Sequence, residues 1–375
     1  MRKEKEIVKS LLWDTGITLN GNAPSDPQIH NEAFYRRVLQ HGSLGLGESY
    51  LEGWWDCESL DQFFYRVLVA NLDSRVKNDW GVMFNIALNF VLNAGRKSKA
   101  FEVGQKHYDV GNDLYGAMLD KRLTYTCGYW NSPAGKAKNL DEAQEAKLDL
   151  VCKKIDLRPG QKVLDIGSGW GSFMGYAVEK YGVNALGITV SKKQKELADN
   201  RYKNLPVETR LQDYRDLKEK FDKIVSLGMF EHVGYKNYTT FMKVVYNSLR
   251  DNGLFLLHTI GGNRSVKGND PWIEKYIFPN STLPSIKQIG QSIEGLFVME
   301  DWHNFGVDYD LTLMAWHKNF EDNWDKLKSN YDDKFYRMWR YYLLVCAGTF
   351  RVRKNQLWQI VLSKKGVPGG YQSIR

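Results

Sequence analysis

The sequence predicts an α/β protein: a mostly parallel sheet with helices on both faces, joined to a smaller N-terminal helical domain. Three observations support this fold class. From about residue 140, short apolar strands alternate with segments of helical periodicity, as in a parallel sheet covered on both faces. A glycine-rich turn, "GSGWG", follows the first of these strands. Residues 1–95 show helical periodicity interrupted by loops such as "LNGNAPSDP".

The alternating region defines the elements in order. Helices are expected at 141–155, from about 171, at 191–204 and at 235–250. Strands are expected at 162–167, 184–190, 207–212, 221–228 and 253–260. The segments 296–306 and 356–364 supply two further strands, the last of them antiparallel at the edge of the sheet. Two insertions, at about 262–290 and 306–352, interrupt this core.

Composition excludes several classes of protein. Of the 375 residues, 43% are apolar and 26% are charged, which indicates a globular chain with a sizeable core. The N-terminal stretch "MRKEKEIVKSLLWD" has a helical stripe and is no signal peptide, so a cytoplasmic protein is expected. No CxxC pair occurs, and neither a metal site nor a disulfide framework is predicted from the four separated cysteines, Cys57, Cys127, Cys152 and Cys346.

The charge balance favours an anionic partner. The net charge of +8 suits either a nucleic acid or a negatively charged membrane surface, and charge alone does not choose between them. The longest uncharged stretch, 80–95, is too short to span a membrane and is followed by "RKSK". This pair of features fits a helix lying in a lipid interface, and equally a core helix whose final cations favour its C-terminal dipole.

The glycine turn predicts a ligand site. In an open α/β sheet, ligands bind beyond the C-terminal strand ends, where a glycine turn lets the backbone approach them; here the glycines are Gly167, Gly169 and Gly171. Ser172 stands where a dinucleotide fingerprint has its third glycine, which disfavours a nicotinamide cofactor. The next strand also ends without the expected acid.

Other polar groups near the strand ends could contact a nucleoside. Thr189 and Gln194 offer a hydroxyl and an amide, and Gln212 and Asp213 follow the next strand, where an adenine would lie. For Gln194 or Asp213 taken alone, a solvated loop or a helix cap explains the residue as well.

Ordered motifs along nearly the whole chain carry a resemblance. They include "LEGWWDC", "KHYDVGNDLY", "LTYTCGYW", "VLDIGSGWGSF", "GMFEHVG", "DPWIEKYIFPN" and "CAGTFR". The chain resembles the Rossmann-like class I S-adenosylmethionine-dependent methyltransferases, and among them the bacterial cyclopropane-fatty-acyl-phospholipid synthase family. That family often has Cys where this chain has Ser168; the turn needs a small residue, which Ser also provides.

The resemblance implies a seven-stranded sheet and three regions. Residues 1–95 would form a helical domain for lipid or membrane docking, and 96–120 a linker and cofactor lid that includes His107 and Asp113. Residues 121–375 would form the catalytic domain. The contacts to S-adenosylmethionine would come from Tyr125, Thr126, Asp165, Gly167, Ser168, Gly169, Gly171, Thr189, Gln194, Gln212 and Asp213.

The implied reaction converts a cis double bond in an acyl chain of a membrane phospholipid to a cyclopropane, with a bound bicarbonate ion. The contacts to this ion would come from Cys127, Glu231, His258, Ile260 and Tyr309, some of them through the backbone. An alkene needs alignment more than a base for attack, but closing the ring requires removal of a proton from the added methyl group. A held bicarbonate is a mild base that a cation would not readily alkylate.

Each of these residues also has an ordinary structural explanation. His258 could be a satisfied histidine at a strand end, Glu231 an acid at a helix N-terminus, and Tyr309 a packed ring with one hydrogen bond. Cys346 has apolar flanks typical of an inert thiol and is not assigned to the site. The motif context favours the functional roles.

The implied partners are unsaturated phospholipid in the bilayer and an anionic membrane surface, with reversible peripheral attachment to its inner face. A homodimer is left open. A related lipid methyltransferase that leaves a branched methyl or methoxy group is the nearest alternative. A lipid-binding protein without activity is a second, and a nucleic-acid methyltransferase is disfavoured because no "NPPY"-type segment is present.

Overall fold

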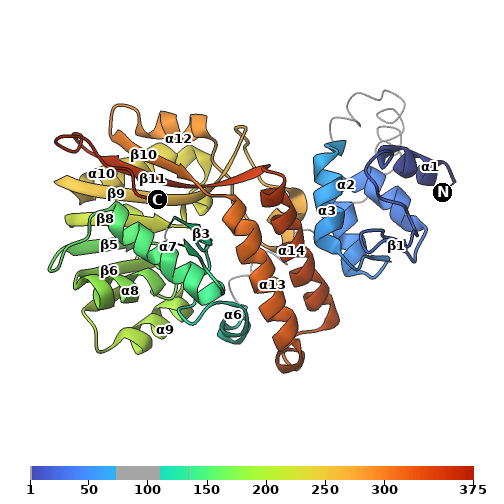
Figure 1. The fold of residues 1–375 in the computed structure, drawn as a ribbon, viewed down its shortest axis with the longest axis horizontal. Coiled ribbons are helices and arrows are strands. Elements are labelled where there is room, and N and C mark those ends of the chain that lie inside the picture. Colours follow the sequence, from blue (N-terminus) through green and yellow to red (C-terminus); the bar gives the residue numbers. More distant parts are fainter. Residues whose placement is uncertain (1, 73–109, 134) are drawn as a thin grey trace. The chain divides into compact units, whose positions relative to one another are not determined.

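The computed structural model describes residues 2–72, 110–133 and 135–375 (Figure 1). Contacts divide the chain into two compact units, which are described separately. The first comprises Met1–Val110, Asn269–Pro279 and Trp316–Lys354, and the second comprises Gly111–Gly268, Asn280–Ala315 and Asn355–Arg375. The predicted membrane segment 80–98, with Arg96 and Lys97, lies outside the described residues, as do Lys99 and His107.

The second unit contains a seven-stranded sheet in the order β10-β11-β9-β8-β5-β6-β7. Strands β7, β6, β5, β8 and β9 are parallel, whereas β11 is antiparallel to both β9 and β10. This is the predicted class I methyltransferase fold. The strand bounds are β5 Lys162–Ile166, β6 Asn184–Thr189, β7 Val207–Leu211, β8 Phe221–Leu227, β9 Leu249–Gly262, β10 Val298–Asn304 and β11 Asn355–Ser363.

One prediction about the sheet was wrong. The last strand, β11, is antiparallel as expected, but it lies between β9 and β10 and not at the edge. Nearly all of β11 is buried, whereas β10 carries two acids and is largely accessible. A polar strand tolerates the edge because solvent satisfies its unpaired backbone groups, while an apolar strand is stabilised by neighbours on both sides.

Helices cover both faces of the sheet (Figure 1). Successive residues of β5 point to opposite sides, so Val163 joins the core under α7 and α8, and Leu164 joins the core under α10 and α12. The helices of this unit are α6 Asn112–Met118, α7 Leu140–Lys154, α8 Ser172–Tyr181, α9 Lys192–Tyr202, α10 Tyr238–Ser248 and α12 Ile286–Ile293. Short 3₁₀ turns occur at η2 Tyr214–Asp216, η3 Phe230–His232 and η4 Tyr235–Asn237, and a small hairpin at β3 Asn131–Ser132 and β4 Gly135–Lys136.

The first unit is helical, with one two-residue strand pair. Its elements are α1 Arg2–Leu11, β1 Gln28–Ile29, α2 Ala33–Leu51, β2 Trp55–Asp56, α3 Leu60–Val69, α11 Pro271–Tyr276 and α14 Asp333–Arg351. Helix α13, Val307–Leu327, begins in the second unit and ends in the first. Parts of both predicted insertions, 269–279 and 316–352, therefore group with the N-terminal residues.

Helix α14 completes the core of the first unit. Its Tyr341 ring lies 5.6 Å from the Tyr50 ring and 5.0 Å from the Phe64 ring, measured between centroids. Arg337 donates from Nε to the Tyr50 carbonyl at 2.6 Å and from a terminal nitrogen to the Trp55 carbonyl at 2.9 Å. Residues from the C-terminal third of the chain thus bury the aromatic side chains of the first 70.

No helix in the described parts of the chain combines the length and the apolar character needed to cross a membrane.

Candidate active site

The glycine turn joins β5 to α8. Its glycines have two different reasons: close packing at Gly167 and Gly171, and open space at Gly169. A Cβ at Gly167 would lie 2.5 Å from the Met229 Cβ, and one at Gly171 would lie 2.9 Å from the Tyr202 ring, so packing excludes larger residues there. At Gly169, with φ 54°, a Cβ would meet no described atom within 4 Å. Only Gly169 therefore has the open surroundings that close approach of a ligand requires.

Asp165 is a buried acceptor beside this turn. It is the fourth residue of β5, and its Oδ1 has no hydrogen-bond partner among the described residues. Burial raises the pKa of Asp165 to about 7, and the positive charge of Lys147 partly opposes that rise. An unpaired buried carboxylate oxygen fits an incoming cationic donor, such as the amino group of a methionine moiety.

The ends of β6 and β7 are joined by hydrogen bonds. The Thr189 hydroxyl donates to Gln194 Oε1 at 2.8 Å, and the backbone N–H of Gln212 donates to the Thr189 carbonyl at 3.0 Å. The adjacent Val190 is 81% exposed, which leaves an apolar surface at the same strand end. Three of the predicted nucleoside contacts are thus brought together.

Asp213 forms a helix cap, the structural role that the sequence also allowed. Its carboxylate caps η2 by accepting the Arg215 amide at 2.9 Å, and it pairs with the Arg215 guanidinium at 2.7 Å. This hydrogen bond lowers the pKa of Asp213. The Asp213 side chain is therefore engaged in this local cap.

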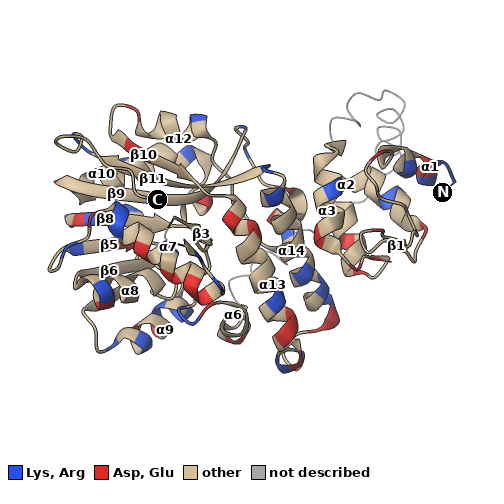
Figure 2. Ribbon diagram, viewed as in Figure 1, with Lys and Arg blue, Asp and Glu red and all other residues tan. Residues whose placement is uncertain are grey.

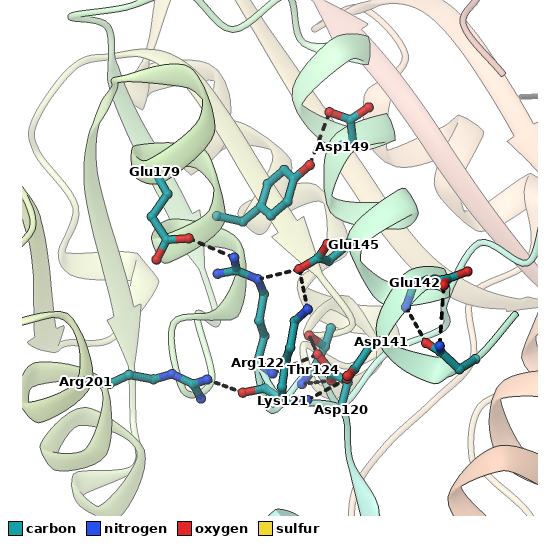
Figure 3. Close-up of polar contacts among 12 residues, drawn as sticks. Asp120, Lys121, Arg122, Thr124, Asp141, Glu142, Glu145, Asp149, Glu179 and Arg201 are labelled. Atoms are coloured by element: carbon teal, nitrogen blue, oxygen red, sulfur yellow. Dashed lines mark hydrogen bonds and ion pairs between the residues drawn. The ribbon is translucent and has the colours of Figure 1, made fainter. Parts of the chain in front are cut away.

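The loop at 120–124 leads into the predicted cofactor residues and is held at several points, as Figure 3 shows. The buried Asp120 carboxylate accepts the Arg122 amide at 2.9 Å and the Thr124 amide at 2.7 Å. Between them, Leu123 has φ 59°, a left-handed conformation that these bonds help to maintain. Arg122 also pairs with Glu179 of α8 at 2.8 Å.

Side chains of helix α7 fix the segment Tyr125–Cys127, which follows this loop. Two of its fully buried polar side chains reach Thr126: Lys147 donates from Nζ to the Thr126 hydroxyl at 2.7 Å, and Gln144 donates from Nε2 to the Thr126 carbonyl at 2.7 Å. The Thr126 methyl group packs against Gly228, where a Cβ would lie 2.7 Å away. This holds the Tyr125–Cys127 segment at the end of β8.

Aromatic residues connect this segment to the glycine turn. The Tyr115 ring of α6 lies 5.2 Å from the Tyr125 ring and 4.7 Å from the Trp170 ring. The Trp170 indole nitrogen donates to Asn112 Oδ1 at 3.1 Å. The described end of the predicted lid, which includes Asp113, therefore packs against the glycine turn through α6.

Two buried polar atoms lie near the end of β8: one belongs to Glu231, which follows β8, and the other to His258, which lies within β9 and not at its end as the sequence suggested. Glu231, in η3, accepts the Ile260 amide through Oε1 at 2.6 Å, and its Oε2 has no partner in the described part of the chain. His258 Nε2 is likewise buried and unpartnered among the residues described. The Gly228 backbone N–H donates to the His258 carbonyl at 2.9 Å and joins the end of β8 to β9. An acceptor and a ring nitrogen are thus left without partners.

Burial sets the ionisation of both groups. It raises the pKa of Glu231 to about 7, an effect that the Ile260 amide partly opposes. It holds the pKa of His258 well below 6.5, with further lowering from the charges of Lys147 and Lys154. His258 is therefore a neutral ring near pH 7, while the Glu231 carboxyl titrates closer to neutrality than an exposed glutamate does.

Two more of the predicted anion contacts are Tyr309 and Cys127. The first two turns of α13 contain Tyr309 and fix the segment of Cys127. Asp308 accepts the Trp130 amide at 2.7 Å, and Thr312 accepts the Gly128 amide at 3.0 Å, which fixes the segment containing Cys127. Tyr309, 8% exposed, belongs to the same turn. Burial raises the pKa of the Cys127 thiol well above its usual range, so Cys127 is not a nucleophile.

Sequence reasoning missed several residues that support the site: Asp120, Gln144, Lys147, Asp308, Thr312 and Gln359. A signal existed for Lys147, because it lies one helical turn from both Ala143 and Val151 on the buried face of α7. No comparable signal marks Gln359, since an isolated amide in an apolar strand is ordinary.

The fold, the glycine turn and the buried acceptor at Asp165 define an S-adenosylmethionine-dependent methyltransferase of class I. Residues 95–360 match the family described as mycolic acid cyclopropane synthetase, and the chain belongs to it. Cyclopropane-fatty-acyl-phospholipid synthase of Escherichia coli strain K12 is 50% identical over 369 residues, 98% of this chain and 95% of that protein. The chain is accordingly an enzyme that uses S-adenosylmethionine.

Solved structures agree with this assignment. The cyclopropane synthase MmaA2 from Mycobacterium tuberculosis superposes with a TM-score of 0.65 and is 29% identical, covering 70% of this chain and 97% of its own. The mycolic acid cyclopropane synthase CmaA1, complexed with SAH and CTAB, has a TM-score of 0.64 at 32% identity, with the same coverage.

Proposed function

We propose that this enzyme forms cyclopropane rings at cis double bonds in the acyl chains of membrane phospholipids, and that a bound bicarbonate ion removes the proton that closes the ring. The phospholipid substrate is supported by the name of the Escherichia coli relative, which matches along nearly the full length of both chains. The observation that supports the bicarbonate is that two buried atoms, Glu231 Oε2 and His258 Nε2, have no hydrogen-bond partner among the described residues.

This pair matches the chemistry of the ion. Bicarbonate has one hydroxyl that donates and anionic oxygens that accept, so it suits one carboxylate acceptor together with one neutral N–H donor. When bound, it supplies a mild base to the reaction. Glu231 orients the ion, and its link to the Ile260 amide fixes the carboxylate. Tyr309 and the backbone near Cys127 close the niche.

S-adenosylmethionine, when bound, supplies an electrophilic methyl group. Asp165 holds its amino group, Gly169 allows close approach, and Thr189, Gln194, Gln212 and the backbone of Asp213 contact the nucleoside. Tyr125 and Trp170 offer ring faces that stabilise nearby positive charge without attacking it. No basic side chain is needed for the methyl transfer itself, because an alkene loses no proton before attack.

Docking at the cytoplasmic face of an anionic membrane is part of this proposal. Lys and Arg occur in both units together with Asp and Glu (Figure 2), so the described residues do not single out one docking face. The net charge of +8 and the sequence pairing of an apolar stretch with "RKSK" support membrane attachment.

Substitution at the anion niche tests the proposal. Glu231→Ala and His258→Ala should lower turnover at least about 100-fold while changing the affinity for S-adenosylmethionine less than about threefold. Turnover is followed on unsaturated phospholipid vesicles, and affinity by calorimetry. Glu274→Ala, which removes an exposed acid of α11, serves as the matched control and should be neutral. Equal losses of turnover and affinity would contradict the assigned roles.

Isotope retention identifies the product. With trideuteromethyl-labelled S-adenosylmethionine, ring formation keeps two of the three deuterium atoms, because one leaves with the base. A branched methyl product with a shifted double bond, formed by loss of a proton from the acyl chain, would keep all three deuterium atoms and would replace this proposal with the related methyltransferase activity.

A further inference from the structure

Three polar side chains form a row across the sheet beside the site. In the register of the antiparallel strands, His258 of β9 is directly opposite Gln359 of β11, and Gln359 is directly opposite His303 of β10. Residues paired in this way share one face of the sheet. Gln359 is fully buried between Trp358 and Ile360 of β11 and is not part of the predicted site.

The contact between Gln359 and His258 determines which ring nitrogen carries hydrogen. Gln359 Nε2 lies 3.3 Å from His258 Nδ1. In the orientation that the structure gives the Gln359 amide, its nitrogen donates to Nδ1, which places the hydrogen of the neutral ring on Nε2; Gln359 Oε1 has no partner among the described residues. That N–H is the buried atom for which the described residues provide no partner.

We infer that Gln359 is a positioning residue: it selects the Nε2–H tautomer of His258 and thereby turns this ring nitrogen into a donor to a bound anion. The inference rests on the proposed function. The other tautomer would direct a lone pair at the anion and repel it. Because burial keeps His258 neutral, its tautomer and not its charge decides what the ring offers.

The far end of the row supports an orienting role. Lys154 Nζ lies 3.0 Å from His303 Nδ1 and 3.4 Å from Asp301, which also pairs with Arg375 at 2.7 Å. Burial, with the nearby charges of Lys154 and Arg375, lowers the pKa of His303 to about 3. His303 therefore brings no charge of its own to Gln359, and the effect on His258 is one of hydrogen-bond direction.

Nitrogen NMR of the full-length protein tests the inference directly. With ¹⁵N-labelled histidine, and the His258 signal identified by its loss in His258→Gln, the unaltered protein should show a protonated Nε2 and an unprotonated Nδ1. Gln359→Glu keeps the side-chain shape but accepts from Nδ1, so the hydrogen should move to Nδ1. A protonated Nδ1 in the unaltered protein would overturn the inference without any variant.

Activity gives the second readout. Gln359→Glu should lower kcat at least about tenfold in the folded protein while the affinity for S-adenosylmethionine is retained. Gln356→Leu removes another buried amide of β11, one that pairs with Asn304 at 2.8 Å and not with His258, and should leave the tautomer and kcat unchanged. A Gln359→Glu protein with unaltered kcat or an unaltered Nε2–H would refute the role.

The two proposals fail in different ways. If turnover does not depend on bicarbonate in carbonate-depleted buffer, the proposed anion is wrong, whatever the tautomer. If turnover depends on bicarbonate but the tautomer does not respond to Gln359→Glu, the inference about Gln359 is wrong.

Discussion

Glu231 and Asp165 are buried carboxyl groups whose pKa values burial raises to about 7. Each has one oxygen that the described residues leave unpaired. Ordinary structural acids are paired or hydrogen-bonded, and perturbed carboxyls in a cleft are typical of functional sites. At this scale, the residue types and their strand ends were predictable, whereas the ionisation was not, because it depends on burial by residues far along the chain.

A pH dependence of turnover follows for Glu231. Only its carboxylate form can accept the hydroxyl of a bound anion, so with a pKa of about 7 kcat should fall about tenfold per pH unit below pH 7 and level off above it. The measurement is kcat from about pH 6 to 8.5 at saturating S-adenosylmethionine and a fixed bicarbonate concentration. Glu231→Gln should be slow and lack this limb; an unchanged profile in the variant would assign the limb to another group.

Helix α7 shows how an element positions the site. Its exposed side is rich in acids (Figure 2), while Lys147 is directed inward to Thr126 and lowers the pKa of Asp165. Burial, in turn, lowers the pKa of Lys147 to about 8. Lys147 therefore acts on two parts of the site: its charge acts on Asp165 of β5, and its hydrogen bond fixes the Tyr125–Cys127 segment.

Removing this lysine should alter cofactor binding in a pH-dependent way. If the Asp165 carboxylate holds the amino group, affinity for S-adenosylmethionine should weaken as pH falls through about 7. In Lys147→Met the cation that lowers the Asp165 pKa is absent, so the midpoint should move upward by about one pH unit. Calorimetry across pH gives the midpoint. Lys153→Met, which removes an exposed lysine of the same helix, should leave it in place.

Local patterning predicted most elements, but not all of their positions. The strands around residues 162–166 and 221–227 were recognisable because apolar runs alternate with helices. The place of β11 inside the sheet depends on pairing between strands distant in sequence, and only the greater polarity of β10 hints at it. Gln359 contacts His258, which lies 101 residues away along the chain, and no local sequence pattern indicates such a contact.

On the scale of the whole molecule, membrane attachment can be separated from general positive charge. Changing Arg96, Lys97 and Lys99 to Gln should weaken binding to anionic vesicles about tenfold or more, since each basic residue near such a surface contributes about 1 kcal/mol. Affinity for S-adenosylmethionine should not change. Vesicle sedimentation measures the binding.

A second triple variant controls for net charge. Lys318 and Lys326 belong to α13, and Lys328 belongs to the turn after it; changing all three to Gln removes the same number of charges. It should leave vesicle binding nearly intact. Equal losses in both triple variants would mean that total charge, and not the predicted docking segment, drives attachment.

The chain crosses between its two units at residues 110, 268, 279, 315 and 354. During synthesis, the aromatic side chains of the first 70 residues leave the ribosome long before α14, the helix that buries Tyr50 and Phe64. The usual order, in which an N-terminal domain folds first, leaves these side chains without their partners in α14. Completion of this core therefore waits until the helix that ends at residue 351 has been synthesised.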